Sequence, residues 1–281
     1  MNPDGYSWRM DRAFPRSVAV LFAAVAVVAI LAMLRSLTRD PERGQRPAMV
    51  VVVDAGHGGD DGGTVVFGLK EKDLALDLAR RLARALEVRG LKAVLTRSDD
   101  SSVPLDQRVS VAREHPGAVF VSLHLNRFGS HSVQGLETYV CSPPDPVEIR
   151  LEPGDAPRSY RDHRSHLLAE RIAEAAAEAS GLQARGVREA GFKVLKDVPA
   201  PAVLVECGYL SNPEDARLLA KSEVRAKLAE AIAGQIDRFL LERRENRLLG
   251  FSAWAGDPPP KPAPESTATP DAPEGEPSAE P

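Results

Sequence analysis

The segment VVVDAGHGGDDGG, residues 51–63, joins a short run of β-branched apolar residues to a loop rich in glycine. The apolar run, residues 50–53, predicts a buried strand that ends at Asp54. Glycines stand on both sides of His57, and because they lack a Cβ atom they leave the backbone there free to adopt unusual conformations. The segment therefore predicts a histidine on a loop at the carboxyl end of a buried strand.

Strand and helix patterns alternate through the roughly 200 residues that follow. Strands are predicted at residues 49–54, 92–96, 118–124, 135–140 and 202–206, with a weaker one at 192–195. Helices are predicted at residues 71–89, 105–114, 165–179, 213–220 and 223–243. This alternation predicts an α/β fold, with a single twisted, mostly parallel (mixed) sheet flanked by helices.

The N-terminal part of the chain has a different composition. Residues 18–34 carry no charge and lie between Arg16 and Arg35. This run is short for a membrane-spanning helix, but it lacks a clear small-residue cleavage motif, which favours an uncleaved transmembrane signal anchor over a cleaved signal peptide. Arginines flank the run on both sides, so the charges do not decide its orientation.

The predicted order is an N-terminal segment at 1–17, a signal anchor at 18–34, a linker at 35–47, a globular domain at 48–249 and a tail at 250–281. The tail is rich in Pro, Ala and Glu and is predicted to be disordered. The net charge of -4 and the pI near 5.9 argue against a nucleic-acid-binding protein.

Three chemically active side chains follow predicted strands. His57 follows the first, His124 ends the strand at 118–124, and Glu206 ends the strand at 202–206. In an open α/β sheet, ligands bind beyond the carboxyl ends of the strands. If these strands run parallel, both imidazoles and the carboxylate meet at one edge.

Glu71 is a fourth candidate, at the start of the predicted helix 71–89. The spacing of its leucines places Glu71 on the buried face, where an unpaired carboxylate is costly. A metal ion would pair with it. The alternative is a glutamate that the helix dipole favours at this end.

Two histidines and one glutamate, with a position left for water, form a common catalytic zinc set. A further carboxylate, Glu206, is placed to take a proton from water and pass it to a leaving amine. The residues thus indicate metal-assisted hydrolysis of an amide, although the H-E-x-x-H signature is absent.

The chain resembles the zinc-dependent N-acetylmuramoyl-L-alanine amidases, the amidase type 3 family. The resemblance covers residues 49–240 and rests on VVVDAGHGGDDGG, GLKEKDLALDLA, VLTRSDD, LDQRVSVA, VFVSLHLN, GLETYV, RGVREAGFKVLK and PAVLVECGYLSNPED. It implies that His57, Glu71 and His124 bind Zn²⁺ and that Glu206 is the catalytic carboxylate. The implied substrate is peptidoglycan, cleaved between N-acetylmuramic acid and L-alanine.

Asn126 and Arg185 also match family positions near the site. Each has a simpler interpretation, a turn cap for Asn126 and a surface salt bridge for Arg185. Gly191 stands where the family often has Asn. The stretch 141–160 has several prolines and no helical stripe, so we expect no inserted helix that blocks the zinc.

Since peptidoglycan lies outside the cytoplasm, the resemblance implies an inner-membrane protein with residues 1–17 in the cytoplasm and an extracytoplasmic, periplasmic catalytic domain. An activator or division protein is a further possible partner. Three alternatives stay open: a zinc peptidase or deacetylase, a non-catalytic peptidoglycan-binding or regulatory protein, and a cytoplasmic orientation with a regulatory role. Cys207 is expected on the face opposite Glu206, as a buried small residue.

Overall fold

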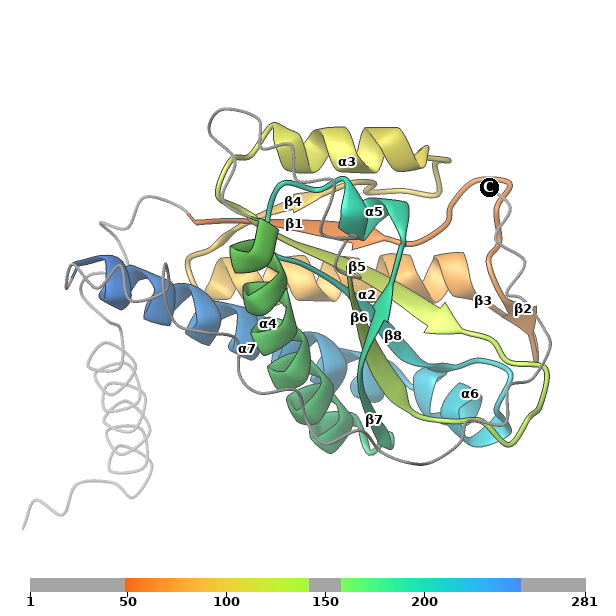
Figure 1. Cartoon of the computed structure of the whole chain (residues 1–281). Coiled ribbons are helices and arrows are strands. Elements are labelled where there is room, and N and C mark those ends of the chain that lie inside the picture. The colour runs from red at the N-terminus through yellow and green to blue at the C-terminus, as the bar shows by residue number, and fades with distance from the viewer. Residues whose placement is uncertain (1–48, 142–157, 249–281) are drawn as a thin grey trace, which may run out of the picture. The chain divides into compact units, whose positions relative to one another are not determined.

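The computed structural model describes residues 49–141 and 158–248 (Figure 1). The chain divides into two units, Met1–Met49 and Val50–Pro281, and the fold described here belongs to the second. The predicted anchor at 18–34, the linker at 35–47, the tail at 250–281 and most of the stretch at 141–160 lie outside the described residues. Among the described helices, none is long and apolar enough to span a bilayer.

A six-stranded sheet forms the centre of the fold, in the order β4-β1-β5-β8-β6-β7. β1 is parallel to β4 and β5, and β5 is parallel to β8, whereas β6 is antiparallel to β8 and parallel to β7. The bounds are β1 Val50–Ala55, β4 Lys92–Leu95, β5 Val119–Asn126, β6 Leu136–Cys141, β7 Ala184–Ala190 and β8 Ala202–Tyr209. The predicted mixed, mostly parallel sheet is confirmed.

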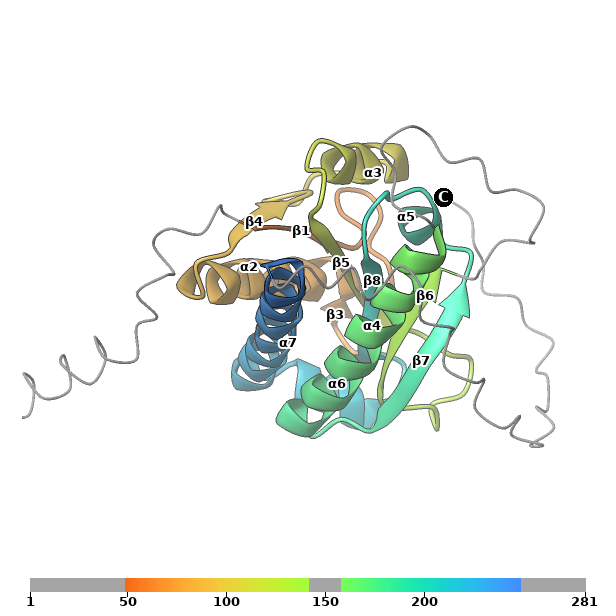
Figure 2. The same cartoon turned by 60° about the vertical axis from the view of Figure 1, so that its left-hand side comes forward.

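Helices cover both faces of this sheet (Figure 2). α2, α4 and α7 lie on one side, and the shorter α3 and α5 lie on the other. Their bounds are α2 Glu71–Val88, α3 Leu105–Arg113, α4 Arg158–Ser180, α5 Lys193–Lys196, α6 Pro213–Leu219 and α7 Ser222–Leu248. A small antiparallel hairpin, β2 Val65–Val66 with β3 Leu69–Lys70, leads directly into α2 and was not predicted.

Side chains alternate between the two faces along each strand. Val52, Phe120 and Leu204 pack in one buried cluster with residues of α3 and α5. His124 and Glu206 follow Phe120 and Leu204 at even spacing, so they belong to this same face of the sheet. Cys207 is fully buried on the opposite face, as predicted, and both cysteines are free.

The predicted strand at 192–195 is wrong, because these residues mostly lie in the short helix α5. The sixth strand is instead β7, whose sequence ARGVREA has no apolar run. Within residues 49–141 and 158–248, β7 is at the edge of the sheet and pairs only with β6. An edge strand can carry exposed polar side chains, so its sequence gives little strand signal.

Candidate active site

The candidate site lies at the carboxyl ends of β1, β5 and β8. These three strands are parallel, which meets the condition on which the sequence argument depended. His124 on β5 lies opposite Glu206 on β8 in the register of the two strands. His57 follows β1, so one edge of the sheet carries both imidazoles and this carboxylate.

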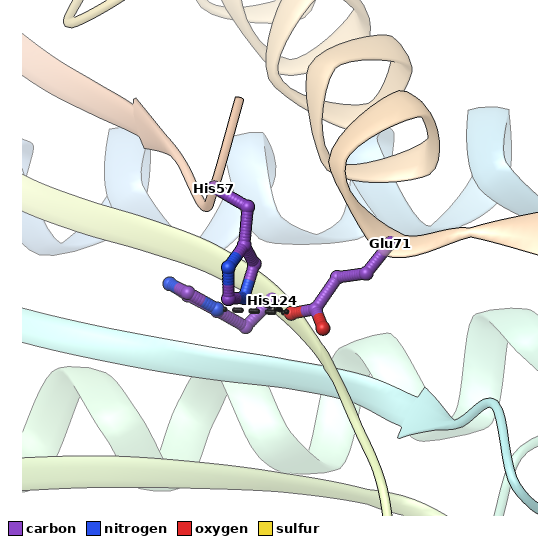
Figure 3. Close-up of side chains that lie close together, drawn as sticks. All are labelled: His57, Glu71 and His124. Atoms are coloured by element: carbon purple, nitrogen blue, oxygen red, sulfur yellow. Dashed lines mark hydrogen bonds and ion pairs between the residues drawn. The ribbon is translucent and has the colours of Figure 1, made fainter. Parts of the chain in front are cut away.

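Glu71 completes the cluster from the first turn of α2 (Figure 3). Its Oε1 atom lies 3.0 Å from Nε2 of His57 and 3.0 Å from Nδ1 of His124. One ligand atom from each of the three residues lies within 4.8 Å of the others. The structure thus brings together the three residues predicted as metal ligands.

Backbone donors hold the Glu71 carboxylate in place. Oε1 accepts a hydrogen bond of 3.0 Å from the N–H of Leu125, and Oε2 accepts one of 2.9 Å from the N–H of Thr64. Burial by itself raises the pKa of Glu71, but the bonds to His124 and His57 outweigh it and lower the pKa well below the usual range. A buried, ionised carboxylate therefore stands between the two imidazoles.

Two buried arginines shape the loop that carries His57. Arg97 donates through Nε to the carbonyl of Ala55 at 2.9 Å and through Nη2 to that of Gly56 at 2.8 Å. Arg108 donates through Nη2 to the carbonyl of His57 at 2.8 Å. His57 itself has a φ of 57°, which is unusual for a residue with a side chain. The VLTRSDD and LDQRVSVA motifs thus supply the side chains that fix this loop.

Two glycines leave room for the cluster. A Cβ atom on Gly56 would lie 2.4 Å from Cε1 of His124. A Cβ atom on Gly63 would lie 2.6 Å from Oε2 of Glu71 and 2.7 Å from Cδ2 of His57. Real Cβ atoms essentially never come this close to their neighbours, so packing against the site favours glycine at both positions, and Gly63 also has a φ of 59°.

Asp61 contacts the cluster from outside and was not among the predicted site residues. Its Oδ2 atom lies 2.6 Å from Nδ1 of His57, while its Oδ1 atom accepts a bond of 2.9 Å from the N–H of Gly63. A carboxylate on the second nitrogen of a metal-binding histidine fixes the tautomer and orients the ring. The sequence signal that could have revealed Asp61 is its position four residues after His57.

Glu206 stands beside the cluster without being part of it. The residue is partly exposed, but its Oε2 atom is buried and has no hydrogen-bond partner among the described residues. Burial first, and then the charges of Glu71 and Glu137, raise the pKa of Glu206 well above its usual value. This carboxylate oxygen therefore has hydrogen-bonding capacity that no described residue uses.

The donor set fits zinc. Two imidazole nitrogens and one carboxylate oxygen within 4.8 Å of one another are a set found in catalytic zinc sites, where the fourth position is open. The unpaired oxygen of Glu206 next to the cluster also fits a catalytic zinc site, where a second carboxylate beside the metal transfers protons.

The two predicted substrate residues, Asn126 and Arg185, converge on a residue that the sequence argument missed. Asn126 donates through Nδ2 to Oε1 of Glu137 at 3.0 Å, and Arg185 donates through Nε to Oε2 of Glu137 at 3.0 Å. Glu137 is 1% exposed. The signal that could have revealed it is an acidic residue inside the predicted strand at 135–140.

The fold and the cluster together define an α/β protein with a candidate metal centre at the carboxyl ends of its parallel strands. Residues 51–238 match the family model described as N-acetylmuramoyl-L-alanine amidase, and the chain belongs to this family. The family and the enzyme class inferred from the motifs are thereby confirmed.

Individual relatives agree with this assignment. LytC of Bacillus subtilis (strain 168), an N-acetylmuramoyl-L-alanine amidase, is 35% identical over 182 residues, which are 65% of this chain and 34% of that protein. The chain thus spans about a third of the length of LytC.

Two solved structures show the same fold. The amidase AmiC2 of Nostoc punctiforme matches with a TM-score of 0.59 and 35% identity, over 69% of this chain and 97% of that one. The CwlD amidase from Clostridioides difficile, solved in complex with the GerS lipoprotein, matches with a TM-score of 0.60 and 28% identity, over 69% and 99%.

Proposed function

We propose that this chain hydrolyses the amide bond between N-acetylmuramic acid and L-alanine in peptidoglycan. In this proposal His57, Glu71 and His124 hold a zinc ion, and Glu206 transfers the protons. The observation that carries it is the three-residue donor cluster with the unbonded Oε2 atom of Glu206 beside it. Family membership supplies the identity of the bond.

When bound, zinc supplies a Lewis acid that polarises a carbonyl and makes water more acidic. Glu206 accepts a proton from the attacking water as the new C–O bond forms. It then gives that proton to the nitrogen of L-alanine as the C–N bond breaks. The products are the lactyl carboxylic acid of the sugar and a peptide with a free amino terminus, so atoms and charge balance.

The protein's own groups prepare this step. Glu71 is held in place by two backbone donors, and Asp61 orients His57, so the ligands need little rearrangement to bind a cation. Arg97 and Arg108 fix the loop around His57 through its carbonyls. A preorganised set of donors lowers the cost of reorganisation during the reaction.

The test is to incubate purified peptidoglycan with the zinc-loaded protein and to identify the released peptides by mass spectrometry. We expect stem peptides that begin with a free L-alanine amino group, and none from Glu206→Gln. Cleavage of an internal peptide bond, or loss of acetyl groups alone, would instead identify a peptidase or a deacetylase. Binding of peptidoglycan without any cleavage would support a non-catalytic role.

We further propose that residues 18–34 anchor the chain in the cytoplasmic membrane, with residues 48–249 as the catalytic domain on the outer side. The location of the substrate supports this orientation. The solved complex of CwlD with the GerS lipoprotein supports a protein partner for this chain also. A reporter fused after Pro281 and active only outside the cytoplasm is the expected result, and activity only inside would contradict the orientation.

A further inference from the structure

A second polar cluster lies on the same face of the sheet, centred on Glu137. Both oxygens of this buried carboxylate are fully used, and five donors from four strands surround it. The donors are Asn126 Nδ2 at 3.0 Å, Tyr139 OH at 2.7 Å and Tyr209 OH at 2.7 Å on Oε1, and Arg185 Nε at 3.0 Å and Arg188 Nε at 2.8 Å on Oε2.

The charges in this cluster do not cancel. Burial by itself raises the pKa of Glu137, but the hydroxyls of Tyr139 and Tyr209 and the two arginines outweigh it and lower that pKa, so the carboxylate is ionised. Glu137 faces two guanidinium groups, and Arg185 also lies near the carboxyl group of Asp215, so Arg188 is the arginine that these acidic groups leave unmatched. A salt bridge that only neutralised Glu137 would need a single arginine.

The surplus charge faces outward. Arg188 bonds Glu137 through Nε, and its side chain is 47% exposed. Its two terminal nitrogens have no hydrogen-bond partner in the described residues. Arg185 is 26% exposed and stacks over the ring of Tyr209 at 5.4 Å. With Nε bound inward, the Nη1–Nη2 edge of Arg188 is left for a planar, bidentate anion.

The guanidinium group of Arg188 belongs to a row of residues that runs across the sheet from the active site. Glu206 is opposite His124 on one side and opposite Glu137 on the other, in the registers of β5–β8 and β6–β8. Tyr139, two residues after Glu137, is opposite Arg188 on β7. The row therefore crosses three strand spacings, about 14 Å, and Arg188 is offset by two further residues, about 7 Å along the strands, so the backbones of His124 and Arg188 are about 16 Å apart.

A carboxylate is the planar anion that a peptide substrate can present at such a distance. An extended peptide rises about 3.3 Å per residue, so the first few residues beyond the scissile amide reach along this row. Lysine would supply charge without the bidentate fork, and the use of two arginines at fixed positions fits recognition of a carboxylate.

We propose that Arg185 and Arg188, positioned by Glu137, bind a free carboxylate of the stem peptide and make the enzyme prefer that carboxylate over the corresponding carboxamide. This inference rests on the proposed function, because it takes the stem peptide as the substrate. It adds a specificity site, on the side of β6 and β7, to the cluster that performs the reaction.

The experiment measures binding and hydrolysis separately. Muramoyl peptides are prepared in matched pairs, one pair for each carboxylate of the stem, which differ only by one carboxamide. Equilibrium binding is measured by calorimetry with the full-length, zinc-loaded Glu206→Gln protein, which leaves the ligand intact. We expect one pair in which the carboxylate form binds about tenfold more tightly or better, since hydrogen bonds between a guanidinium group and a carboxylate are stronger than those to a neutral amide.

The same measurement is repeated with Arg188→Gln added. We expect the tenfold preference to disappear through weaker binding of the carboxylate form, while the carboxamide form and the zinc content change little. Arg188→Lys should keep part of the preference. Arg238→Gln, which removes a 70% exposed arginine that pairs with Glu242 on α7, is the matched control and should keep all of it.

Equal binding within every pair overturns the inference, as does an equal loss of both forms on Arg188→Gln. Thermal unfolding of each variant shows whether a loss of binding comes from misfolding. If Arg188→Gln is misfolded, the binding preference is measured with Arg188→Lys instead. If the native enzyme hydrolyses neither form but the binding preference is present, the carboxylate site stands and the proposed reaction fails. If both forms are hydrolysed equally and bound equally, the reaction stands and the carboxylate site fails.

Discussion

His57 is held between two carboxylates, with Glu71 on Nε2 and Asp61 on Nδ1. Removal of an outer carboxylate of this kind typically weakens metal binding by about 10–100-fold. We therefore expect Asp61→Ala to bind zinc about 10–100-fold more weakly and Asp61→Asn, which keeps an acceptor oxygen, to lose less. Competition with a zinc chelator measures this affinity.

The neighbouring residue provides the control for Asp61. Asp60 is exposed, and Asp60→Ala should bind zinc as the native chain does. Native affinity in Asp61→Ala would show that the contact at 2.6 Å does not orient His57.

Gly56 is the second residue on which the metal site depends, because it has no side chain. Because a Cβ atom there would lie within 2.7 Å of three atoms of the His124 ring, Gly56→Ala must displace that ring. We expect zinc affinity to fall by about tenfold or more, the lower range for a disturbed metal environment. Gly191→Ala, where a Cβ atom meets nothing within 4 Å, is the matched control. Equal zinc affinity in both variants would contradict the packing argument.

The four principal site residues could be predicted because each has a local signal. His57, His124 and Glu206 end strands that can be read from apolar runs, and Glu71 begins a helix whose leucine spacing defines its buried face. Glu137 and Arg188 could not be predicted in the same way. Their partners lie on other strands, and the register of β6 with β8 and β7 brings them together.

At the scale of elements, a buried ion pair joins β1 to α3. Asp54 is 1% exposed and accepts from Arg108 Nη1 at 2.6 Å, Thr96 Oγ1 at 2.6 Å and Ser122 Oγ at 2.7 Å. Burial alone would raise the pKa of Asp54, but Arg108 and the two hydroxyls outweigh it and lower that pKa. The pair therefore stabilises the contact between these elements when Asp54 is ionised.

The sign of the pH effect follows from this lowered pKa. The unfolded state takes up a proton near pH 3.9, at a higher pH than the folded state does, so the stability from Asp54 is complete above about pH 3.9 and is lost as pH falls through the folded pKa. We expect Asp54→Asn to lower the free energy of unfolding at pH 7 by about 3–5 kcal/mol, since it leaves Arg108 buried without its partner.

Urea unfolding of the metal-free protein at several pH values tests this. The stability of the native chain should fall more steeply with acid than that of Asp54→Asn, so the two curves converge at low pH. Asp106→Asn, which changes an aspartate with an 85% exposed side chain on α3, should follow the native curve. Parallel curves for Asp54→Asn and the native chain would show that the ion pair has no part in acid unfolding.

The elements differ in how far local sequence determines them. Local sequence determines the strands β1, β5 and β8 through their apolar runs and the helix α2 through its leucine spacing. The predicted bounds of these elements agree with the structure to within a few residues. β7 is polar because one edge of it is unpaired, and α5 is too short for a helical period to be visible. In both cases pairing and packing with β6, β8 and α3 decide the conformation.

For the whole molecule, the metal cluster joins three separate parts of the chain: the loop after β1, the start of α2 and the end of β5. A ligand that binds only the folded state adds RT ln(1 + [L]/Kd) to its stability, which is about 4 kcal/mol at 1,000 times Kd. We expect zinc to raise the Tm and a chelator to lower it. The metal-free chain should still fold, because Glu71 keeps its two backbone donors.

Thermal unfolding with and without zinc provides the measurement, and His124→Ala provides the control, since its Tm should not respond to zinc. A Tm that rises equally in both proteins would place the zinc effect somewhere other than this cluster.

Zinc content and peptidoglycan hydrolysis, determined together in the native chain, Glu206→Gln and His124→Ala, separate the metal ligands from the proton-transferring residue. We predict about one zinc per chain in the native protein and in Glu206→Gln, and much less in His124→Ala. We predict hydrolysis by the native protein only, with a loss of about 100-fold or more in Glu206→Gln. A Glu206→Gln protein that loses its zinc, or one that keeps native activity, would contradict the division between three metal ligands and one proton-transferring carboxylate.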